Sequence, residues 1–242
     1  KNYPETIQLG DIKKINLSSL PKIDLVIGGS PCQSFSTLGN KKGLQGESGL
    51  FYEFVRIMKE LKPTFFLLEN IKMKKEWRDI ITKEMGVEPI EINSNEFSAQ
   101  NRVRLYWTNI PQTKWIVNDV KLSEVLEDLH FRDIPKGFFI KWGDKPRVEK
   151  GLNWIKNTKS NTLTTKNCHT IQYLLNENKT KLRLLSVHEF ERLQTLPLDY
   201  TEGIPNGERY KCIGNGWTID VLTHIFSLLP KDVVGKKGEP HE

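Results

Sequence analysis

Cys32 is the residue of this chain best placed to act as a nucleophile. The apolar run from Asp24 to Gly29 predicts a buried strand, and Ser30 and Pro31 lead from its end to the cysteine. The glycines allow close approach of the backbone, and the proline restrains its own φ and the residue before it. Ligands of α/β sheets gather at the carboxyl ends of parallel strands, where the thiolate form of a cysteine can attack. A small buried cysteine is the plainer alternative.

Glu69 stands at the end of a second apolar run, which begins at Phe65. Burial raises the pKa of a carboxyl group, which suits a group that must donate or share a proton near neutral pH. Because successive parallel strands end at the same edge of a sheet, we expect Glu69 and Cys32 to meet in one crevice. A surface glutamate at a strand end is the alternative.

Three further polar residues, Gln100, Arg102 and Arg104, alternate along the chain. In an extended segment all three would project to one face. Guanidinium groups suit the recognition of phosphate, carboxylate or base carbonyl groups, whereas a solvated edge strand is the alternative. Asn215, flanked by two glycines, would either cap the following helix or line a cofactor pocket.

The elements that must position these residues alternate between strands and helices. Apolar residues at helical spacing after Leu50 predict one helix, and Gly86 would end a second helix that begins near Trp77. This alternation is the signature of an α/β sheet covered by helices, and such connections make the strands parallel. The strands are expected at Asp24 to Gly29, Thr64 to Glu69, Val87 to Ile92 and Arg104 to Thr108.

The chain is expected to divide into a main domain and a small lobe. Residues 1–111 carry the alternating pattern, and residues 112–181 are irregular and rich in Lys, Asn, Thr and Trp. Residues 182–242 would return to the main domain, because a capping-box pattern at Ser186 to Glu189 and a helix from about Thr218 restore regular structure.

The composition fits a polyanionic partner and gives no sign of a metal site. Among 242 residues, 36 Lys and Arg against 30 Asp and Glu give a net charge of +6. The three cysteines and five histidines lack the spacing of a disulfide framework or of metal ligands. No stretch approaches the roughly 20 apolar residues of a membrane span, so a cytoplasmic protein without membrane association is expected.

Five motifs, in this order, resemble those of the C5-cytosine DNA methyltransferases. Each is short and weak alone, but five in register over almost the whole chain are specific. The phenylalanine-rich run after Leu50 and the short middle lobe further resemble the subgroup of animal de novo enzymes and similar phage or bacterial enzymes. The motifs are the nucleophile loop Gly28 to Gln33, the Glu-Asn-Val motif at Glu69 to Ile71, the Gln-x-Arg-x-Arg motif at Gln100 to Arg104, and the C-terminal motifs at Glu191 to Pro197 and Gly214 to Asn215.

The resemblance implies a Rossmann-like, S-adenosylmethionine-dependent methyltransferase fold, mostly parallel with helices on both faces, with 112–181 as the target recognition lobe. The partner would be double-stranded DNA, from which a cytosine is flipped out. Cys32 would add to C6 and Glu69 would hydrogen-bond to or protonate N3. C5 would then take the methyl group, leaving S-adenosylhomocysteine. Arg104 would hold the cytosine carbonyl, and Arg102 would support the loop or the same base.

The resemblance also implies the remaining site residues. Asp11 and Ile12 match the family's adenine contacts, and Pro31, Leu50 and Asn215 would close around the rest of the cofactor. The residues expected to line the substrate site are Ser30, Gln33, Asn70 and Gln100.

One expected part of the family pattern, the opening strand with its aromatic-x-Gly-x-Gly turn, is not found in the 242 residues. We expect it on a preceding segment, on a complementary N-terminal chain or on a further methyltransferase subunit. Two alternatives therefore stay open. The chain could be a non-catalytic DNA-binding fragment or subunit of a split methyltransferase, or it could belong to the tRNA-methylating branch of the family.

Overall fold

The computed structural model describes residues 2–30, 50–113, 117–134, 141–142, 145–146, 153–154, 156, 158–163 and 173–230. Its backbone contacts divide the chain into two compact units. The first unit comprises Lys1–Ile92, Val103–Lys114 and Ile225–Glu242, and the second comprises Asn93–Arg102 and Trp115–His224. The boundaries predicted after residues 111 and 181 delimit the lobe expected to recognise DNA, which is a functional division. Backbone contacts do not test this division, so it stays a prediction.

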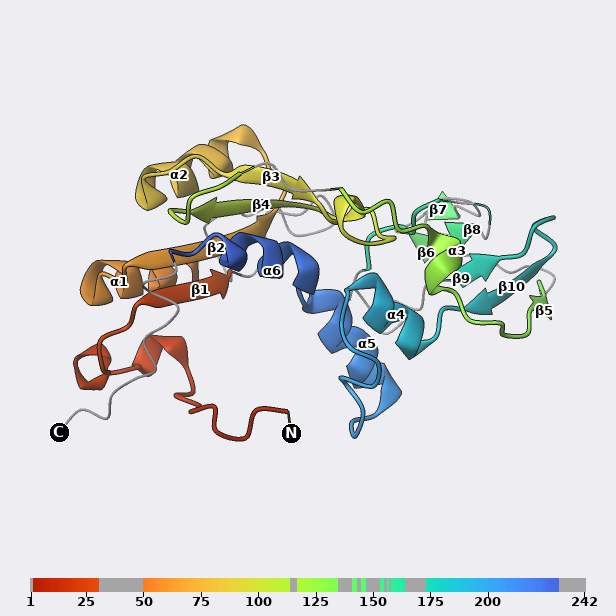
Figure 1. Ribbon diagram of the computed structural model, residues 1–242, viewed down its shortest axis with the longest axis horizontal. Helices are drawn as coiled ribbons and strands as arrows, with labels where there is room; N and C mark the ends of the chain where they lie inside the picture. The colour runs from red at the N-terminus through yellow and green to blue at the C-terminus, as the bar shows by residue number, and fades with distance from the viewer. Residues whose placement is uncertain are drawn as a thin grey trace. The chain divides into compact units, whose positions relative to one another are not determined.

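A four-stranded sheet forms the middle of the first unit (Figure 1). Its order is β1 (Leu25–Gly29), β2 (Phe65–Ile71), β4 (Val103–Thr108) and β3 (Ile90–Asn93). β1 and β2 are parallel, as predicted, whereas β4 runs antiparallel to β2. The expectation of a parallel strand at Arg104 to Thr108 is therefore wrong. A short connection without an α-helix joins the neighbours β3 and β4, and only a helix-sized crossover would keep them parallel.

Two helices cover one face of this sheet. α1 (Phe51–Leu61) and α2 (Lys75–Met85) pack against the same side of β2 and β4. Both helices end in a left-handed residue, Lys62 before a proline and Gly86 at the predicted cap. The buried residues of this core are Phe51, Phe54, Val55, Ile81, Phe66, Leu68, Leu105 and Trp107. The predicted α/β class is confirmed.

Gly28 explains how closely α1 approaches β1. A Cβ atom built at Gly28 would lie 2.9 Å from two ring carbons of Phe54. A glycine in the strand therefore leaves room for the aromatic ring. Before β1, the chain forms two 3₁₀ helices, η1 (Ile12–Lys14) and η2 (Leu17–Ser19), each capped by an Asp or Asn side chain.

The second unit contains short strands and several helices. Its larger sheet has the order β5 (Arg132–Asp133), β10 (Lys181–Leu184), β9 (Tyr173–Leu175) and β8 (Asn153–Trp154), and β6 (Lys141–Trp142) pairs with β7 (Lys145–Pro146). The helical elements are η4 (Ser94–Glu96), α3 (Leu122–Val125), α4 (Val187–Leu193) and α5 (Asn206–Asn215), while α6 (Ile219–Ser227) contributes to both units.

The second core is built where α3, α4 and α5 meet the strands. Leu174, Leu185, Phe190, Leu193 and Ile213 are buried together there. The predicted capping box is confirmed, because the side chains of the α4 cap and of the residue three positions later bond to each other's backbone N–H groups. None of the described helices is long and apolar enough to cross a membrane.

Candidate active site

Glu69 and Arg104 form an ion pair on one face of the first unit's sheet. Arg104 Nε lies 2.9 Å from Glu69 Oε1, and the two side chains are only 13% and 11% exposed. In the antiparallel register Glu69 lies opposite Tyr106, so Arg104 is its diagonal neighbour on the same face. The guanidinium also donates from Nη1 to the carbonyl of Val103 at 2.8 Å. The two predicted residues are therefore brought together.

Asn70 fixes the beginning of the predicted nucleophile loop. Its amide Nδ2 donates to Ser30 Oγ at 2.9 Å and to the Ser30 carbonyl at 3.3 Å. The register that pairs Gly29 with Glu69 places these residues side by side at the ends of β1 and β2. Ser30, two residues before Cys32 in the sequence, is therefore held by Asn70, the residue that follows Glu69. Three predicted site residues, Pro31, Cys32 and Gln33, lie outside the described residues, so their geometry stays a prediction.

Arg102 and Gln100 have other neighbours than Arg104. β4 begins only at Val103, so the extended segment predicted for all three residues is not found. Arg102 donates to the backbone carbonyls of Leu163, Gly214 and Gly216 within the second unit.

Gln100 is fully buried and forms an isolated parallel bridge with Ser160. Its amide donates to the Leu193 carbonyl and accepts from the Leu163 N–H group. Both residues hold backbone segments in place, and the roles predicted for them in substrate binding and catalysis stay predictions.

Three predicted cofactor residues of the first unit, Asp11, Ile12 and Leu50, lie on two segments that a hydrogen bond links. Asp11 caps η1 and is exposed, and its Oδ1 accepts from the Lys13 N–H group at 3.1 Å. Arg56 donates to the Ile12 carbonyl at 2.8 Å, which ties η1 to the helix that follows Leu50. Asp11 is exposed and Ile12 and Leu50 are half-buried, so together they offer one hydrogen-bond acceptor and two apolar side chains, which fits the polar edge and apolar face of adenosine.

Asn215 is the last residue of α5, and its side chain is exposed. Helix α6 begins only at Ile219, so the alternative that Asn215 caps the following helix is wrong. Helix α5 itself was not predicted from the sequence. Its low apolar content hides it, and only the local turn signal of the two glycines around Asn215 was recognised.

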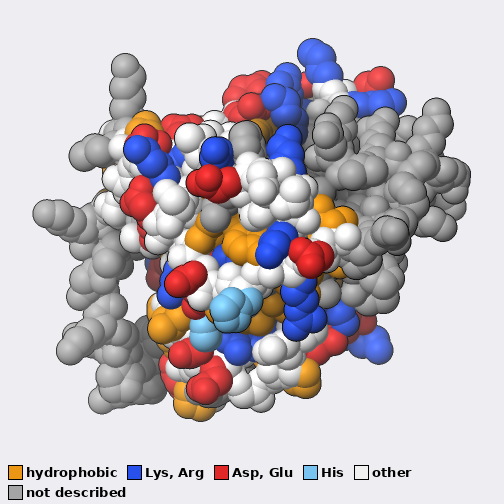
Figure 2. Space-filling view, turned by 90° about the vertical axis from the view of Figure 1, so that its right-hand side faces the viewer, with side chains coloured by type: hydrophobic (Ala, Val, Ile, Leu, Met, Phe, Trp, Pro, Cys, Tyr) orange, Lys and Arg blue, Asp and Glu red, His pale blue; other side chains and the backbone are white. Residues whose placement is uncertain are grey.

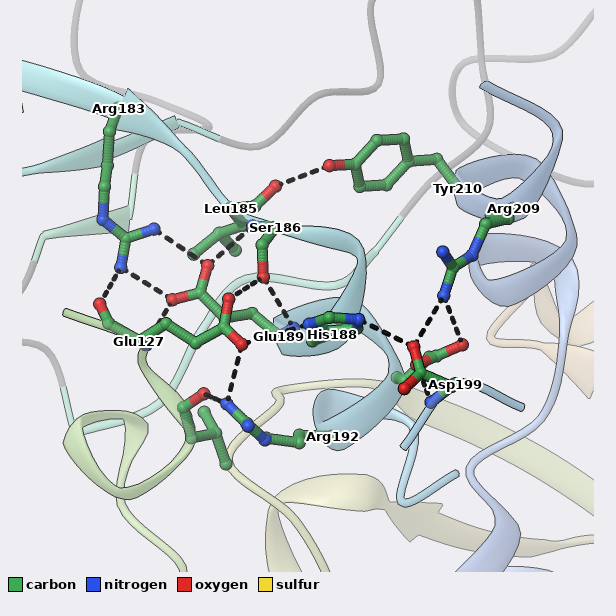
Figure 3. A network of polar contacts seen from close by, with 12 residues as sticks. Glu127, Arg183, Leu185, Ser186, His188, Glu189, Arg192, Asp199, Arg209 and Tyr210 are labelled. Atoms are coloured by element: carbon green, nitrogen blue, oxygen red, sulfur yellow. Dashed lines mark hydrogen bonds and ion pairs between the residues drawn. The ribbon is translucent and has the colours of Figure 1, made fainter. Parts of the chain in front are cut away.

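A polar network in the second unit was also missed (Figure 3). Arg183 forms a bidentate pair with fully buried Glu189, at 2.6 and 2.8 Å. Glu127 lies nearby and accepts from Ser186 Oγ at 2.6 Å. Burial acts to raise the pKa of Glu127, but hydrogen bonds from Ser186 and His188 outweigh it and hold the pKa below its ordinary value. Of this network, only the capping box gives a local sequence signal.

Glu191 anchors the loop after α4. Its carboxylate accepts from the N–H groups of Asp199 and Thr201, each at 2.9 Å, and from Arg209 Nη2 at 3.2 Å. Burial acts to raise the pKa of Glu191, but the bonds from Thr201 and Arg209 lower it below its ordinary value. Ligand atoms of His188, Glu191 and Asp199 lie within 4.8 Å of one another. Arg209 Nη2 lies 3.2 Å from Glu191 Oε1 and 3.8 Å from Asp199 Oδ1, and His188 Nε2 lies 2.8 Å from Asp199 Oδ1. Because these groups already pair with one another, we assign the cluster no metal.

Charges are mixed on the face of the molecule drawn in Figure 2. Among the described side chains there, Lys and Arg are interspersed with Asp and Glu, and histidine and apolar groups lie between them. The net positive charge of the sequence is therefore not gathered into one uniform patch on the described part of this face.

Solved structures with a similar fold are methyltransferases. An Entamoeba histolytica methyltransferase, EhMeth, aligns with a TM-score of 0.69 at 14% identity, covering 96% of this chain and 85% of that one. A putative DNA modification methyltransferase from an Escherichia coli prophage aligns with a TM-score of 0.64 at 17% identity, covering 94% of this chain and 86% of that one. The α/β sheet and its helices thus define an S-adenosylmethionine-dependent methyltransferase fold.

The family model of the C-5 cytosine-specific DNA methylases matches residues 1–110 and 107–231. The chain therefore belongs to the C-5 cytosine-specific DNA methylase family. Among curated relatives, the orphan methyltransferase M.Rho11sI of Bacillus phage rho11s is 30% identical over 240 residues, which cover 90% of this chain and 44% of that protein. The orphan methyltransferase M.SPRI of Bacillus phage SPR is 33% identical over 199 residues, covering 74% of this chain and 43% of the relative. The chain thus spans less than half the length of these relatives.

Proposed function

We propose that this chain is the catalytic and DNA-recognising part of a DNA (cytosine-5-)-methyltransferase. It would transfer a methyl group from S-adenosylmethionine to C5 of a cytosine flipped out of double-stranded DNA. The observation that carries the proposal is the ion pair between Glu69 on β2 and Arg104 on β4. The parallel neighbour of β2, β1, leads along the chain to Cys32. Family membership supports the same substrate class.

Each residue of this group has a distinct task in the proposed reaction. The thiolate of Cys32 adds to C6, and the electron pair of the C5–C6 double bond moves so that C5 becomes nucleophilic. Glu69 hydrogen-bonds to or protonates N3, so that the ring can accept the electrons. Arg104 holds the cytosine carbonyl while its contact with Glu69 keeps the carboxylate oriented toward the base. After the methyl group is on C5, loss of the C5 proton expels the thiolate.

The cofactor would be held by Asp11, Ile12, Leu50 and Asn215, together with Pro31. S-adenosylmethionine supplies an electrophilic methyl group when bound. The exposed carboxylate of Asp11 would accept hydrogen bonds from the adenosine part, and the apolar side chains of Ile12 and Leu50 would cover its flat face. The bond from Arg56 to Ile12 keeps this segment against the helix α1.

DNA is the proposed partner, and the second unit would supply most of the recognition. Positively charged side chains would neutralise phosphates, so binding should weaken as the salt concentration rises. The curated relatives named above come from bacteriophages, and we propose a similar phage or bacterial setting for this chain.

Transfer of a labelled methyl group tests the proposal. The protein is incubated with labelled S-adenosylmethionine and either duplex DNA or tRNA, and each nucleic acid is then added in excess as competitor. Label that is found at cytosine C5 of DNA, and that excess tRNA does not suppress, supports the proposal. Label in tRNA would instead favour the tRNA-methylating branch. Calorimetry with S-adenosylhomocysteine that gives no heat, together with salt-sensitive DNA binding, would favour a non-catalytic subunit.

A further inference from the structure

A cluster of buried polar side chains in the second unit converges on the turn from Gly214 to Gly216. Gln194 is fully buried, and its Nε2 donates to the carbonyls of Ile213 at 2.9 Å and Gly216 at 3.2 Å. Its Oε1 accepts from Thr218 Oγ1 at 2.8 Å and from a second glutamine, Gln100, at 3.2 Å. Every polar atom of the Gln194 amide is therefore used.

Arg102 binds the same turn from another segment. Its Nη2 donates to the Gly214 carbonyl at 3.2 Å and to the Gly216 carbonyl at 2.8 Å. The last carbonyls of a helix have no partner within the helix and usually turn to water or to a capping residue. At the end of α5, two side chains from outside the helix satisfy them instead. The Gly216 carbonyl accepts from both, so the turn is held from two sides.

The same side chains also hold a second backbone segment. Gln100 Oε1 accepts from the Leu163 N–H group at 3.0 Å, and Arg102 Nη1 donates to the Leu163 carbonyl at 3.0 Å. Lys159 extends the attachment, because its ammonium group donates to the carbonyls of Asn95 and Val120 at 3.0 and 2.7 Å. The turn and the segment around Leu163 are thus fixed to one buried cluster.

We propose that Gln194 is a positioning residue for cofactor binding, acting through the turn that carries Asn215, with Arg102 as the second anchor. This inference rests on the proposed function, since the role of Asn215 in binding S-adenosylmethionine comes from the family motif. Asn215 itself is exposed at the end of α5, while its two neighbouring glycines provide the carbonyls that the cluster binds. The cluster fixes the backbone and leaves the Asn215 side chain at the surface.

The alternative is that Gln194 contributes only to the stability of the fold. A positioning role predicts that its substitution weakens cofactor binding, whereas a role in stability alone predicts a lower stability with unchanged cofactor binding. Substitution of Gln194 by Met keeps the size of the side chain but leaves the carbonyls of Ile213 and Gly216 without one donor. Loss of one partner of a buried hydrogen bond typically costs a free energy that corresponds to a factor of about ten or more in an equilibrium constant, here the binding constant for the cofactor. We expect Gln194→Met to weaken S-adenosylhomocysteine binding by about this factor and to raise the KM for S-adenosylmethionine, with little change in DNA affinity.

Tyr210→Phe is the matched control. It removes one hydrogen bond of the same helix, from Tyr210 Oη to the Leu185 carbonyl at 2.9 Å, without touching the turn. This variant should lose less stability than Gln194→Met, which gives up four hydrogen bonds, and should bind S-adenosylhomocysteine as the wild type does. If Gln194→Met folds poorly, Arg102→Lys provides a second variant. Lysine keeps the charge, but its donors all lie on one nitrogen, so it cannot reproduce contacts that Arg102 makes from Nη1 to Leu163 and from Nη2 to Gly214 and Gly216.

Hydrogen exchange and calorimetry together test the inference. The expected result is faster exchange of the amides around Asn215 in Gln194→Met, weaker S-adenosylhomocysteine binding, and neither change in Tyr210→Phe. Unchanged exchange at the turn, or unchanged affinity despite faster exchange, would overturn the role of Gln194 and leave the proposed function intact. A wild-type protein that gives no heat with S-adenosylhomocysteine would overturn the cofactor part of the proposed function, and the role of Gln194 with it.

Discussion

The ion pair of Glu69 and Arg104 leads to the most informative prediction. Substitution of Arg104 by Met leaves the Glu69 carboxylate, which is 11% exposed, without its cation. Removing one partner of a fully buried pair costs about 3–5 kcal/mol, and an exposed pair contributes only about 0.2–1 kcal/mol. Because this pair lies at the edge of a site yet is mostly covered, we expect a loss of about 2 kcal/mol for Arg104→Met.

Glu69→Gln should cost less, about 1 kcal/mol, because the amide oxygen can still accept from Arg104 Nε. The double variant should recover part of the loss of Arg104→Met, with a coupling energy of about 1 kcal/mol between the two positions. Urea denaturation of the four proteins measures these values. The pair of Lys59 and Glu84, at 3.1 Å but with Lys59 69% exposed, is the control and should couple by less than about 0.5 kcal/mol.

The same variants separate structure from catalysis. If Glu69 handles the N3 proton, Glu69→Gln should lower the single-turnover methylation rate by about 10²-fold or more, far beyond its effect on stability. The reasoning fails if the coupling energy is no larger than that of the exposed control pair. It fails equally if Glu69→Gln methylates DNA at the wild-type rate.

Three further predictions concern pH, packing and the entry to the nucleophile loop. In the folded protein the pKa values of Glu127 and Glu191 lie below the ordinary value of 4.5, so their stabilising contribution is present above that pH and is lost as pH falls through the folded pKa values. A melting temperature that falls steadily below about pH 4.5 is expected, and a rise there would contradict it. Gly28→Ala would bring a Cβ atom to within 2.9 Å of an aromatic ring of α1, so denaturation should show a loss of about 1–3 kcal/mol; an unchanged midpoint would mean that the helix shifts freely. Asn70→Ala removes both bonds to Ser30 and should cost about 1 kcal/mol of stability. It should also slow formation of the covalent adduct between Cys32 and cytosine more than the loss of stability alone explains. Equal rates of adduct formation in the variant and the wild type would show that this anchor is not needed.

Local signals were sufficient to predict several elements. The apolar run before Glu69 predicted β2, and Gly86 predicted the end of α2 because a left-handed residue favours glycine. The capping box at Ser186 predicted the start of α4. In each case the physical cause lies within a few residues of the feature, so the sequence alone carries it.

Features that depend on distant contacts were not predictable. The reversed direction of β4 depends on its pairing with β2, and the period-two spacing of Arg102 and Arg104 says nothing about which unit each side chain joins. Arg102 binds carbonyls of Leu163 and Gly216, which are far away in the sequence and carry no side-chain signature as acceptors. A carbonyl group is present in every residue, so such contacts become visible only in three dimensions.

Formation of a covalent complex tests the central claim most directly. Duplex DNA that contains 5-fluorocytosine cannot lose a proton from C5 after methyl transfer, so the enzyme should stay attached through Cys32. With S-adenosylmethionine present, denaturing mass spectrometry should find protein and DNA joined in the wild type, and Cys32→Ser should give no such species. Absence of the adduct in active wild-type protein, or its undiminished formation in Cys32→Ser, would contradict the account.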